Sequence, residues 1–229
     1  TVIPTNKNWP KKYIHDIYKT CDADLILNEK FYKKLSLFKI NLDKLSFEKK
    51  LNLLKNLKLK NKIPYMIFTS GTTSKQKGVV ISEKSYLDYI KWTNKEFISY
   101  KNLKSLILTS ELNFDITFGD IAFALFSNCK IIVTKNNTNI FEIIQLIDKF
   151  KIEVMYTVPN LFKLLFIVLK KYKISKTIKL FISGGEVLNK QICVNAKKLF
   201  PKSNFYNVYG PTECTINITS YKVKLEQLK

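Results

Sequence analysis

The sequence contains no arginine: its 39 basic residues are all lysines, and they give the chain a formal net charge of +21. Proteins that read nucleic acid specifically favour arginine, whose planar guanidinium makes paired hydrogen bonds with bases and phosphates. The lysines are also scattered among Asn, Ile, Phe and Tyr rather than gathered in one segment. We therefore expect a solvated charged face and no specific nucleic-acid partner. A lysine-rich nucleic-acid binder stays as an alternative, which a steep salt dependence of affinity would reveal.

Cysteine and histidine are also scarce. The four cysteines (Cys21, Cys129, Cys193 and Cys214) show no close pairing, which argues against a disulfide framework or a zinc site and fits a reducing cytoplasm. The single histidine, His15, lies in the helix-like stretch YIHDIY. A surface position on a helix explains it better than Ser-His-Asp chemistry does.

Long apolar runs are missing as well. The longest candidate for a membrane span, residues 161–169, is short and is interrupted by Lys163. The N-terminus shows neither a charged and then apolar leader nor an initiating methionine. We expect a cytoplasmic protein without a membrane span, and a chain that is a piece of something longer. At 229 residues, 46% of them hydrophobic, the chain can bury a sizeable core.

Short β-branched or aromatic runs alternate with helical patterns from Pro64 onward. We expect strands at 65–68, 105–109, 130–134, 153–157 and 178–182, and helices at 83–98, 116–127, 140–150, 160–172 and 188–199. Before Pro64 the patterns predict a helix from Pro10 to Lys19, a short strand at 25–27 and a Lys/Leu-rich connection with helical spacing at 30–62. Residues 214–223 alternate like a strand with one wetter face. This order predicts an α/β fold: a mostly parallel sheet covered by helices.

A loop suited to phosphate follows the first of these strands. Residues 65–78 read YMIFTSGTTSKQKG, an apolar run that breaks into glycines, hydroxyls and lysines. Backbone amides, hydroxyls and ammonium groups are good partners for phosphate oxygens. The loop is not a Walker loop, because Gln76 and not glycine precedes the lysine. Taken alone, it fits an ordinary polar turn equally well.

Two further loops follow predicted strands in the same way, residues 110–115 and 183–187. Ligands of such folds bind at the carboxyl ends of the strands. We therefore expect the loops 69–78, 110–115 and 183–187 to meet at one edge of the sheet and to form a single site.

Several motifs resemble those of the adenylate-forming enzymes, the AMP ligases that activate acyl groups and amino acids. The segments that carry the resemblance are TSGTT at 69–73, NFDITFGDI at 113–121, MYTVPNLFKLL at 155–165, LFISGGEVL at 180–188 and NFYNVYGPTEC at 204–214, and residues 2–14 look like the end of an early family segment. The likeness is strongest to amino-acid adenylation domains of nonribosomal peptide synthetases and to D-alanine–carrier protein ligases.

The resemblance implies a reaction and its partners. ATP and an amino acid would give an aminoacyl-AMP and pyrophosphate, with Mg²⁺ as cofactor, and a phosphopantetheine thiol on a carrier protein would then take the aminoacyl group. Residues 1–229 would be the central portion of the large N-terminal domain. The family's ribose-binding aspartate, its C-terminal catalytic lysine and its small C-terminal domain have no counterpart here, so we expect no turnover by this chain alone.

The resemblance also assigns a nucleotide site. The residues are Thr69, Ser70, Gly71, Thr72, Thr73 and Lys77 over the β- and γ-phosphates, Gly184, Gly185 and Glu186 under the nucleotide, and Asn207, Val208, Tyr209, Gly210, Pro211, Thr212 and Glu213. Tyr209 would stack on adenine, Asn207 would accept its exocyclic amine, and Thr212 would bind the α-phosphate. Glu213 would hold Mg²⁺, which takes carboxylate and phosphate oxygens together. Thr212, Glu213 and Lys77 are the candidate catalytic residues.

Two departures from the family pattern weaken the phosphate loop. Ser74 and Gln76 stand where the family has glycine and proline, so the loop loses backbone freedom at one position and a fixed φ at the other. A degenerate, non-catalytic binding protein therefore stays as an alternative.

The expectation that the substrate is an amino acid rests on Asp115. This residue precedes the predicted helix at 116–127, where an N-cap is the ordinary role, but the resemblance implies that it pairs with the α-ammonium of an amino acid. An acyl-CoA ligase, the remaining alternative, would not need this charge. The other expected pocket residues are Ile116, Gly119, Thr157, Phe181, Ser183, Val208, Ile216 and Asn217. Gly119 stands where many relatives have a large side chain, which would deepen the pocket.

Overall fold

The computed structural model describes residues 2–5, 9–21, 63–69, 77–172 and 174–224. The chain divides into two compact units, Thr5–Asn56 and the remainder, Thr1–Pro4 with Leu57–Lys229. In the first unit the structure describes helix α1 (Lys11–Thr20), which confirms the helix expected after Pro10. The strand expected at 25–27 and the connection expected at 30–62 lie outside the described residues.

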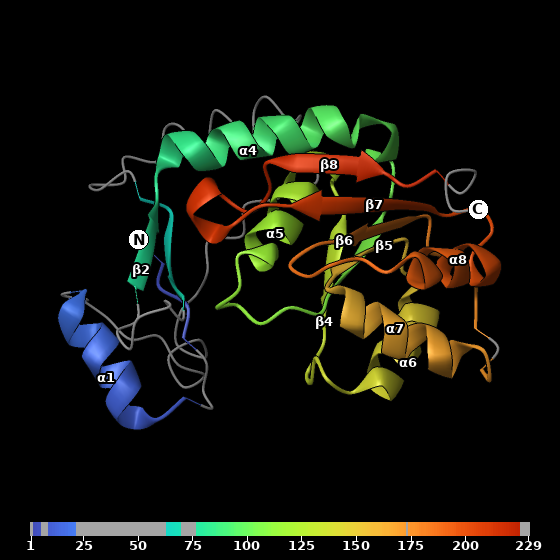
Figure 1. Ribbon diagram of the computed structural model, residues 1–229, viewed down its shortest axis with the longest axis horizontal. Helices are drawn as coiled ribbons and strands as arrows, with labels where there is room; N and C mark the ends of the chain where they lie inside the picture. Colours follow the sequence, from blue (N-terminus) through green and yellow to red (C-terminus); the bar gives the residue numbers. More distant parts are fainter. Residues whose placement is uncertain (1, 6–8, 22–62, 70–76, 173, 225–229) are drawn as a thin grey trace. The chain divides into compact units, whose positions relative to one another are not determined.

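A six-stranded sheet forms the centre of the larger unit (Figure 1). Its strands lie in the order β4-β3-β5-β6-β7-β8; all neighbours are parallel except β7 and β8, which are antiparallel. The bounds are β3 (Ser105–Leu108), β4 (Lys130–Val133), β5 (Val154–Thr157), β6 (Leu180–Ser183), β7 (Asn204–Tyr209) and β8 (Thr219–Lys222). The mostly parallel α/β fold expected from the sequence is confirmed. Because β4 and β5 lie on opposite sides of β3, the strand order reverses there, and folds of this kind bind ligands outside the carboxyl ends of the strands at such a point.

Helices cover both faces of this sheet (Figure 1). Helices α6 (Ile140–Phe150), α7 (Pro159–Leu169) and α8 (Lys190–Leu199) lie on one face, and α4 (Glu83–Glu96) and α5 (Ile116–Ser127) lie on the other. Short 3₁₀ turns form at η2 (Ile98–Tyr100) and η3 (Thr212–Cys214). The side chains of Ser82, Asn139 and Asn189 accept backbone hydrogen bonds at the starts of α4, α6 and α8. Such caps satisfy amides that the first turn of a helix leaves free.

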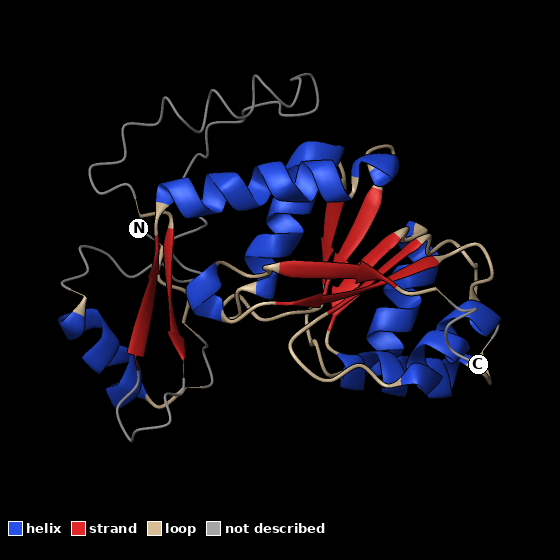
Figure 2. Cartoon of the chain, turned by 45° about the horizontal axis from the view of Figure 1, so that its top comes forward, coloured by secondary structure: helices blue, strands red, loops and turns tan. Residues whose placement is uncertain are grey.

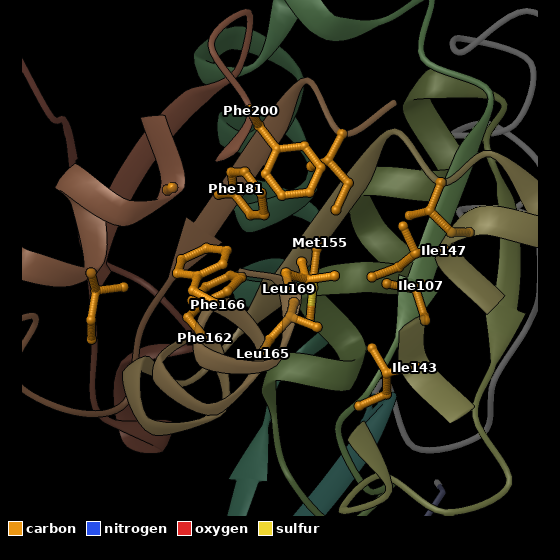
Figure 3. Packing of buried hydrophobic residues seen from close by; sticks show 14 of the residues in the cluster. Ile107, Ile143, Ile147, Met155, Phe162, Leu165, Phe166, Leu169, Phe181 and Phe200 are labelled. Atoms are coloured by element: carbon orange, nitrogen blue, oxygen red, sulfur yellow. The ribbon is translucent and has the colours of Figure 1, made fainter. Parts of the chain in front are cut away.

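Aromatic rings fill the space between the sheet and α6, α7 and α8 (Figure 3). Met155, Phe181 and Phe205 are in register on three neighbouring strands and point to this face. Phe162 lies edge-on to Phe181 and to Phe205, with ring centroids 5.4 Å apart in both pairs. Edge-to-face packing at this distance is favourable beyond the burial of area. Because side chains alternate along a strand, the residues between these point to the face covered by α4 and α5.

The first predicted strand does not belong to this sheet. β1 (Tyr65–Thr69) pairs antiparallel with β2 (Lys77–Ile81), and the two form a separate two-stranded sheet (Figure 2). The expectation that residues 65–68 belong to the main sheet is wrong. β1 buries mainly one face, whereas the central strands β3, β5 and β6 are buried throughout. Residues 70–76 of the phosphate loop lie between β1 and β2, outside the described residues.

The C-terminal part also differs from the prediction. The strand expected at 214–223 is confined to β8, because residues 212–214 form the 3₁₀ turn η3. Residues 204–209, for which the sequence predicts no strand, form β7. Within the part of the chain that the structure describes, no helix combines the length and the apolar character needed to cross a membrane.

Candidate active site

Loops after three parallel strands carry the candidate residues to one edge of the sheet. Residues 109–115 follow β3, Gly184 to Glu186 follow β6, and residues 210–213 follow β7. Two of the three loops expected to converge, 110–115 and 183–187, are thus at the carboxyl ends of the main sheet. The third, 69–78, is the connection of the two-stranded sheet instead. Its described residues are Thr69, Lys77 and Gly78, and Thr69 and Lys77 are register partners at the end of the pair where residues 70–76 connect the two strands.

Asp115 belongs to the motif at 113–121 and interacts with Thr212 of the motif at 204–214. It occupies the N-cap position of α5, but its backbone is helical (φ −66°, ψ −25°) and its side chain makes no capping hydrogen bond. The carboxylate accepts a hydrogen bond from the hydroxyl of Thr212. Burial raises the pKa of Asp115, and the hydrogen bonds from Thr212 and from the backbone of Ile116 partly offset this effect. Among the described residues no basic side chain forms an ion pair with Asp115. A half-buried carboxylate in such surroundings is suited to receive a cation.

The segment after β7 folds back on itself at Gly210. A Cβ atom on Gly210 would lie 2.4 Å from the carbonyl oxygen of Ile216, so only glycine fits there. Thr215 and Ile216 have left-handed backbones (φ 65° and 71°), a conformation that β-branched residues rarely adopt. Strain of this kind is common at functional sites. Tyr209, just before the turn, leaves 64% of its surface exposed.

Gly184 and Gly185 form the turn after β6. A Cβ on Gly184 would approach Val208 Cγ2 to 2.9 Å, and Gly185 has a φ of +85°. Glu186 continues the turn, and its Oε2 accepts a hydrogen bond of 3.3 Å from the backbone N–H of Asn160 in the first turn of α7. The glycines therefore permit close packing of the strand ends, and Glu186 ties their turn to α7.

The space beside Gly119 is already filled. A Cβ on this glycine would lie 3.1 Å from Tyr156 Cε1, 3.1 Å from the Tyr89 hydroxyl and 3.3 Å from Ile216 Cγ2. The Tyr156 hydroxyl donates to Asn217 Oδ1 at 3.0 Å, and Asn217 Nδ2 donates to the Tyr89 hydroxyl at 3.1 Å. The expectation that Gly119 deepens the pocket is therefore wrong, because two tyrosines occupy the volume that the missing side chain leaves.

Three of the expected pocket residues are not brought to this space. Phe181 packs against Phe162, Phe166 and Phe200 in the core on the opposite face of the sheet (Figure 3). This position corrects the expectation that Phe181 lines the pocket. Thr157 and Ser183 lie two residues after Met155 and Phe181, on the same side of their strands, and are buried. Ile116, Val208, Ile216 and Asn217 lie on the Gly119 side, within reach of the glycine positions.

Tyr156 and Tyr89 are the site residues that the sequence analysis missed. Tyr156 directly precedes Thr157, and an offset of one residue along a strand moves a side chain to the other face. If the orientation of β5 and β6 had been known, the alternation of side chains along the strands would have predicted that Tyr156 faces the site. Tyr89 lies on α4, where its position on the apolar face gave no functional signal.

Comparisons with known proteins identify the family of this chain. A family model described as "AMP-binding enzyme" matches residues 1–228. Zwittermicin A synthase ZmaJ of Bacillus cereus is 27% identical over 96% of this chain and 44% of its own length. The D-alanine–D-alanyl carrier protein ligase of Lactococcus lactis is 30% identical over 72% of this chain and 33% of its own length.

Among solved structures, the adenylation domain AlmE of Vibrio cholerae, in complex with glycyl-adenosine-5′-phosphate, superposes with a TM-score of 0.76. It is 22% identical, and the match covers 96% of this chain and 47% of that one, so it shows a shared fold. The chain spans less than half of the length of each of these three proteins.

Proposed function

Because the chain belongs to the family of AMP-binding enzymes, we propose that it is part of an amino-acid-activating ligase. The reaction joins ATP and an amino acid to form an aminoacyl-AMP and pyrophosphate. A phosphopantetheine thiol on a carrier protein then accepts the aminoacyl group. Residues 1–229 form the central portion of the large domain of this ligase.

The hydrogen bond between Thr212 and Asp115 carries this proposal. It joins the residue proposed for the α-phosphate of ATP to the residue proposed for the substrate ammonium. An amino acid held at Asp115 through its ammonium group has its carboxylate within a few bonds of the nucleotide. Catalysis of adenylation is mainly a matter of such positioning and of charge stabilisation at phosphorus.

The residues around Thr212 suit ATP. The exposed ring of Tyr209 is free to stack on adenine, and Gly184 and Gly210 keep side chains away from the strand ends. Asn207 is in register with Ser183 on the neighbouring strand and lies at the same edge. Lys77 and the loop before it are proposed to contact the β- and γ-phosphates.

Glu213 is proposed to hold Mg²⁺. Its carboxylate is exposed in η3, next to Thr212. The described residues contain no group of three or more His, Cys, Asp or Glu side chains placed to bind a metal. Mg²⁺ commonly uses one or two carboxylates together with substrate phosphates, and Glu213 fits that manner of binding. The ion would neutralise phosphate charge while Thr212 and Asp115 orient the two substrates.

Amino-acid-dependent ATP–pyrophosphate exchange tests this proposal. It is measured on the full-length protein that contains this chain, with a panel of D- and L-amino acids and with fatty and aryl acids. We expect exchange with an amino acid and none with the other acids. Exchange with a fatty or aryl acid would favour an acyl-CoA ligase. No exchange with any acid, while Mg²⁺-ATP still binds, would favour a degenerate relative without catalytic activity.

A further inference from the structure

Tyr89, Tyr156 and Asn217 form a continuous surface below the proposed ammonium site, which we call the pocket floor. They come from α4, from β5 and from the loop before β8, so the tertiary fold alone brings them together. Tyr89 and Tyr156 expose only 6% and 3% of their surface. The two hydrogen bonds through Asn217 use the Tyr156 hydroxyl and both ends of the Asn217 amide. A buried network with its members paired in this way is held in one arrangement.

The pocket floor spans the two glycine positions of the site. At one end it touches Gly119, which lies one helical turn after Asp115 and on the same face of α5. At the other end the Tyr156 hydroxyl would lie 3.4 Å from a Cβ on Gly184. The strained Ile216 packs beside Gly119 and keeps Asn217 in place. A substrate side chain that starts at Asp115 and runs along this face of α5 therefore meets the floor.

The enclosed cavity beside Tyr156 and Gly119 is small, whereas an open hollow of about 350 Å³ borders Tyr89 and Asn217 on the side of η3. The enclosed cavity has a volume of about 10 Å³ and is lined by the floor together with Gly119, Asp120 and Ile182 among others. That volume holds about one water molecule. Asp120 lines this cavity, and within the described part of the chain its carboxyl oxygens have no hydrogen-bond partner. An apolar side chain pushed through the floor would break the Asn217 network and bury this carboxyl against carbon.

We infer that the pocket floor restricts the substrate to amino acids with small side chains, of the class of glycine, alanine and serine. This inference rests on the proposed amino-acid activation. A larger side chain must leave at least one buried polar group of the network unpaired, which costs about 1–3 kcal/mol. The corresponding loss of kcat/KM is roughly 10- to 200-fold.

The test compares kcat/KM for small and large amino acids in ATP–pyrophosphate exchange by the full-length protein. Glycine, alanine and serine represent the small class, and leucine, methionine and phenylalanine represent the large one. We expect the best small substrate to exceed every large one by at least about 10-fold. A large amino acid as the best substrate overturns the inference and leaves amino-acid activation intact. Exchange with no amino acid overturns the proposed function and this inference with it.

Variants of Tyr156 test the floor itself. Tyr156→Ala opens it, and we expect the ratio of kcat/KM for leucine over alanine to rise at least about 10-fold. Tyr156→Leu is the second variant, because it keeps more of the packing should the alanine variant fail to fold. The ratio is measured within one protein preparation and does not depend on the folded fraction. An unchanged ratio in a folded variant overturns the inference.

A matched control removes a buried tyrosine elsewhere. Tyr100 packs against Phe97 and Tyr206 on the same side of the sheet, away from Gly119. Tyr100→Ala is expected to lower stability and to leave the leucine-to-alanine ratio as it is in the wild type. A similar change of the ratio in both variants would show a general loosening of the fold and would count against the floor.

Discussion

The carboxylates of Asp115, at the N-cap of α5, and Asp120, within α5, lie in contrasting surroundings although they are only five residues apart. Asp115 is half-buried at the end of the helix and receives a hydrogen bond from Thr212. Asp120 is completely buried, and neither of its oxygens has a hydrogen-bond partner among the residues that the structure describes. Burial raises the pKa of both, and that of Asp120 most strongly. Asp115 is placed to bind a substrate cation, whereas Asp120 lowers the stability of the fold when its buried carboxyl ionises.

Replacing Asp115 by asparagine tests its role in substrate binding. The amide keeps the size of the side chain but cannot pair with an ammonium group, so KM for the amino acid is expected to rise by about 10- to 100-fold with little change in KM for ATP. The expected loss corresponds to that of a charge-assisted hydrogen bond, about 1.5–3 kcal/mol. An unchanged KM for the amino acid would favour a substrate without an α-ammonium group.

Replacing Asp120 by asparagine is expected to stabilise the fold at neutral pH. The unfolded chain loses this proton near pH 4, while the folded protein retains it to a higher pH because burial raises the pKa. Stability of the wild type is therefore highest below pH 4 with respect to this group, and it falls as the pH rises above that value. We expect Asp120→Asn to be more stable than the wild type at pH 7, because the amide removes the cost of burying an ionised carboxylate.

Chemical denaturation at pH 5 and at pH 7 measures this effect. Asp88→Asn is the matched control, because the carboxylate of Asp88 is exposed on α4 and pairs with Lys91 at 2.9 Å. Exposed ion pairs contribute little to stability, so the control should change it only slightly. A lower stability of Asp120→Asn at pH 7 would show that the carboxyl has a role that the asparagine cannot replace.

At the scale of elements, the turn after β6 is connected to the start of α7. The N-cap residue of α7, Val158, has no side chain able to cap the helix, and Pro159 occupies the next position. Glu186 takes over this role from a different strand end, through the backbone N–H of Asn160. A carboxylate is favourable at this end of a helix because of the helix dipole. The same contact holds Gly184 and Gly185 in place.

Glu186→Ala is therefore expected to affect both the helix and the site. We expect a loss of about 0.5 kcal/mol of stability, the size of an exposed interaction with a helix dipole, and a higher KM for ATP because the glycine turn is less firmly held. Thermal unfolding and exchange kinetics provide the two readouts. Glu186→Gln keeps the hydrogen-bond acceptor and should retain most of the wild-type KM. Equal effects of both substitutions would point to the charge and not to the anchoring of the turn.

At the scale of the whole molecule, the chain spans less than half of the length of the relatives described above. The described residues supply Asp115, Thr212 and Glu213, the candidate residues for the substrate, the nucleotide and Mg²⁺. We expect the isolated 229 residues to fold without forming adenylate. Circular dichroism would verify folding, and release of pyrophosphate in the presence of amino acid would measure activity. Amino-acid-dependent release by the isolated chain would contradict this expectation.

The net charge of +21 is a second property of the whole molecule. Like charges that are crowded on a compact surface repel one another and destabilise it. Salt screens this repulsion over a shorter distance, from about 30 Å at 0.01 M to about 10 Å at 0.1 M. We therefore expect the melting temperature to rise between these two concentrations of NaCl. A melting temperature that falls would indicate that attractive ion pairs dominate.

Local patterns in the sequence were sufficient to predict the elements and the motif loops. Helices such as 140–150 and 116–127 were predicted with the bounds that the structure has, because cap residues and apolar periodicity are encoded within one segment. The position of Asp115 at the start of α5 followed from the same local signals. The parallel sheet followed from the alternation of strands and helices.

The tertiary structure alone decided which side chains meet. β5 and β6 are buried on both faces, so their sequences are mostly apolar without alternation and do not show which residues point to the site. For this reason Phe181 could not be separated from its neighbour Ile182, or Thr157 from Tyr156. The pairing of β1 with β2, and the filling of the space beside Gly119 by Tyr89 and Tyr156, depend on contacts between residues far apart in the chain. The sequence by itself determined the elements and the family motifs, whereas the depth of the pocket was decided only when distant segments packed together.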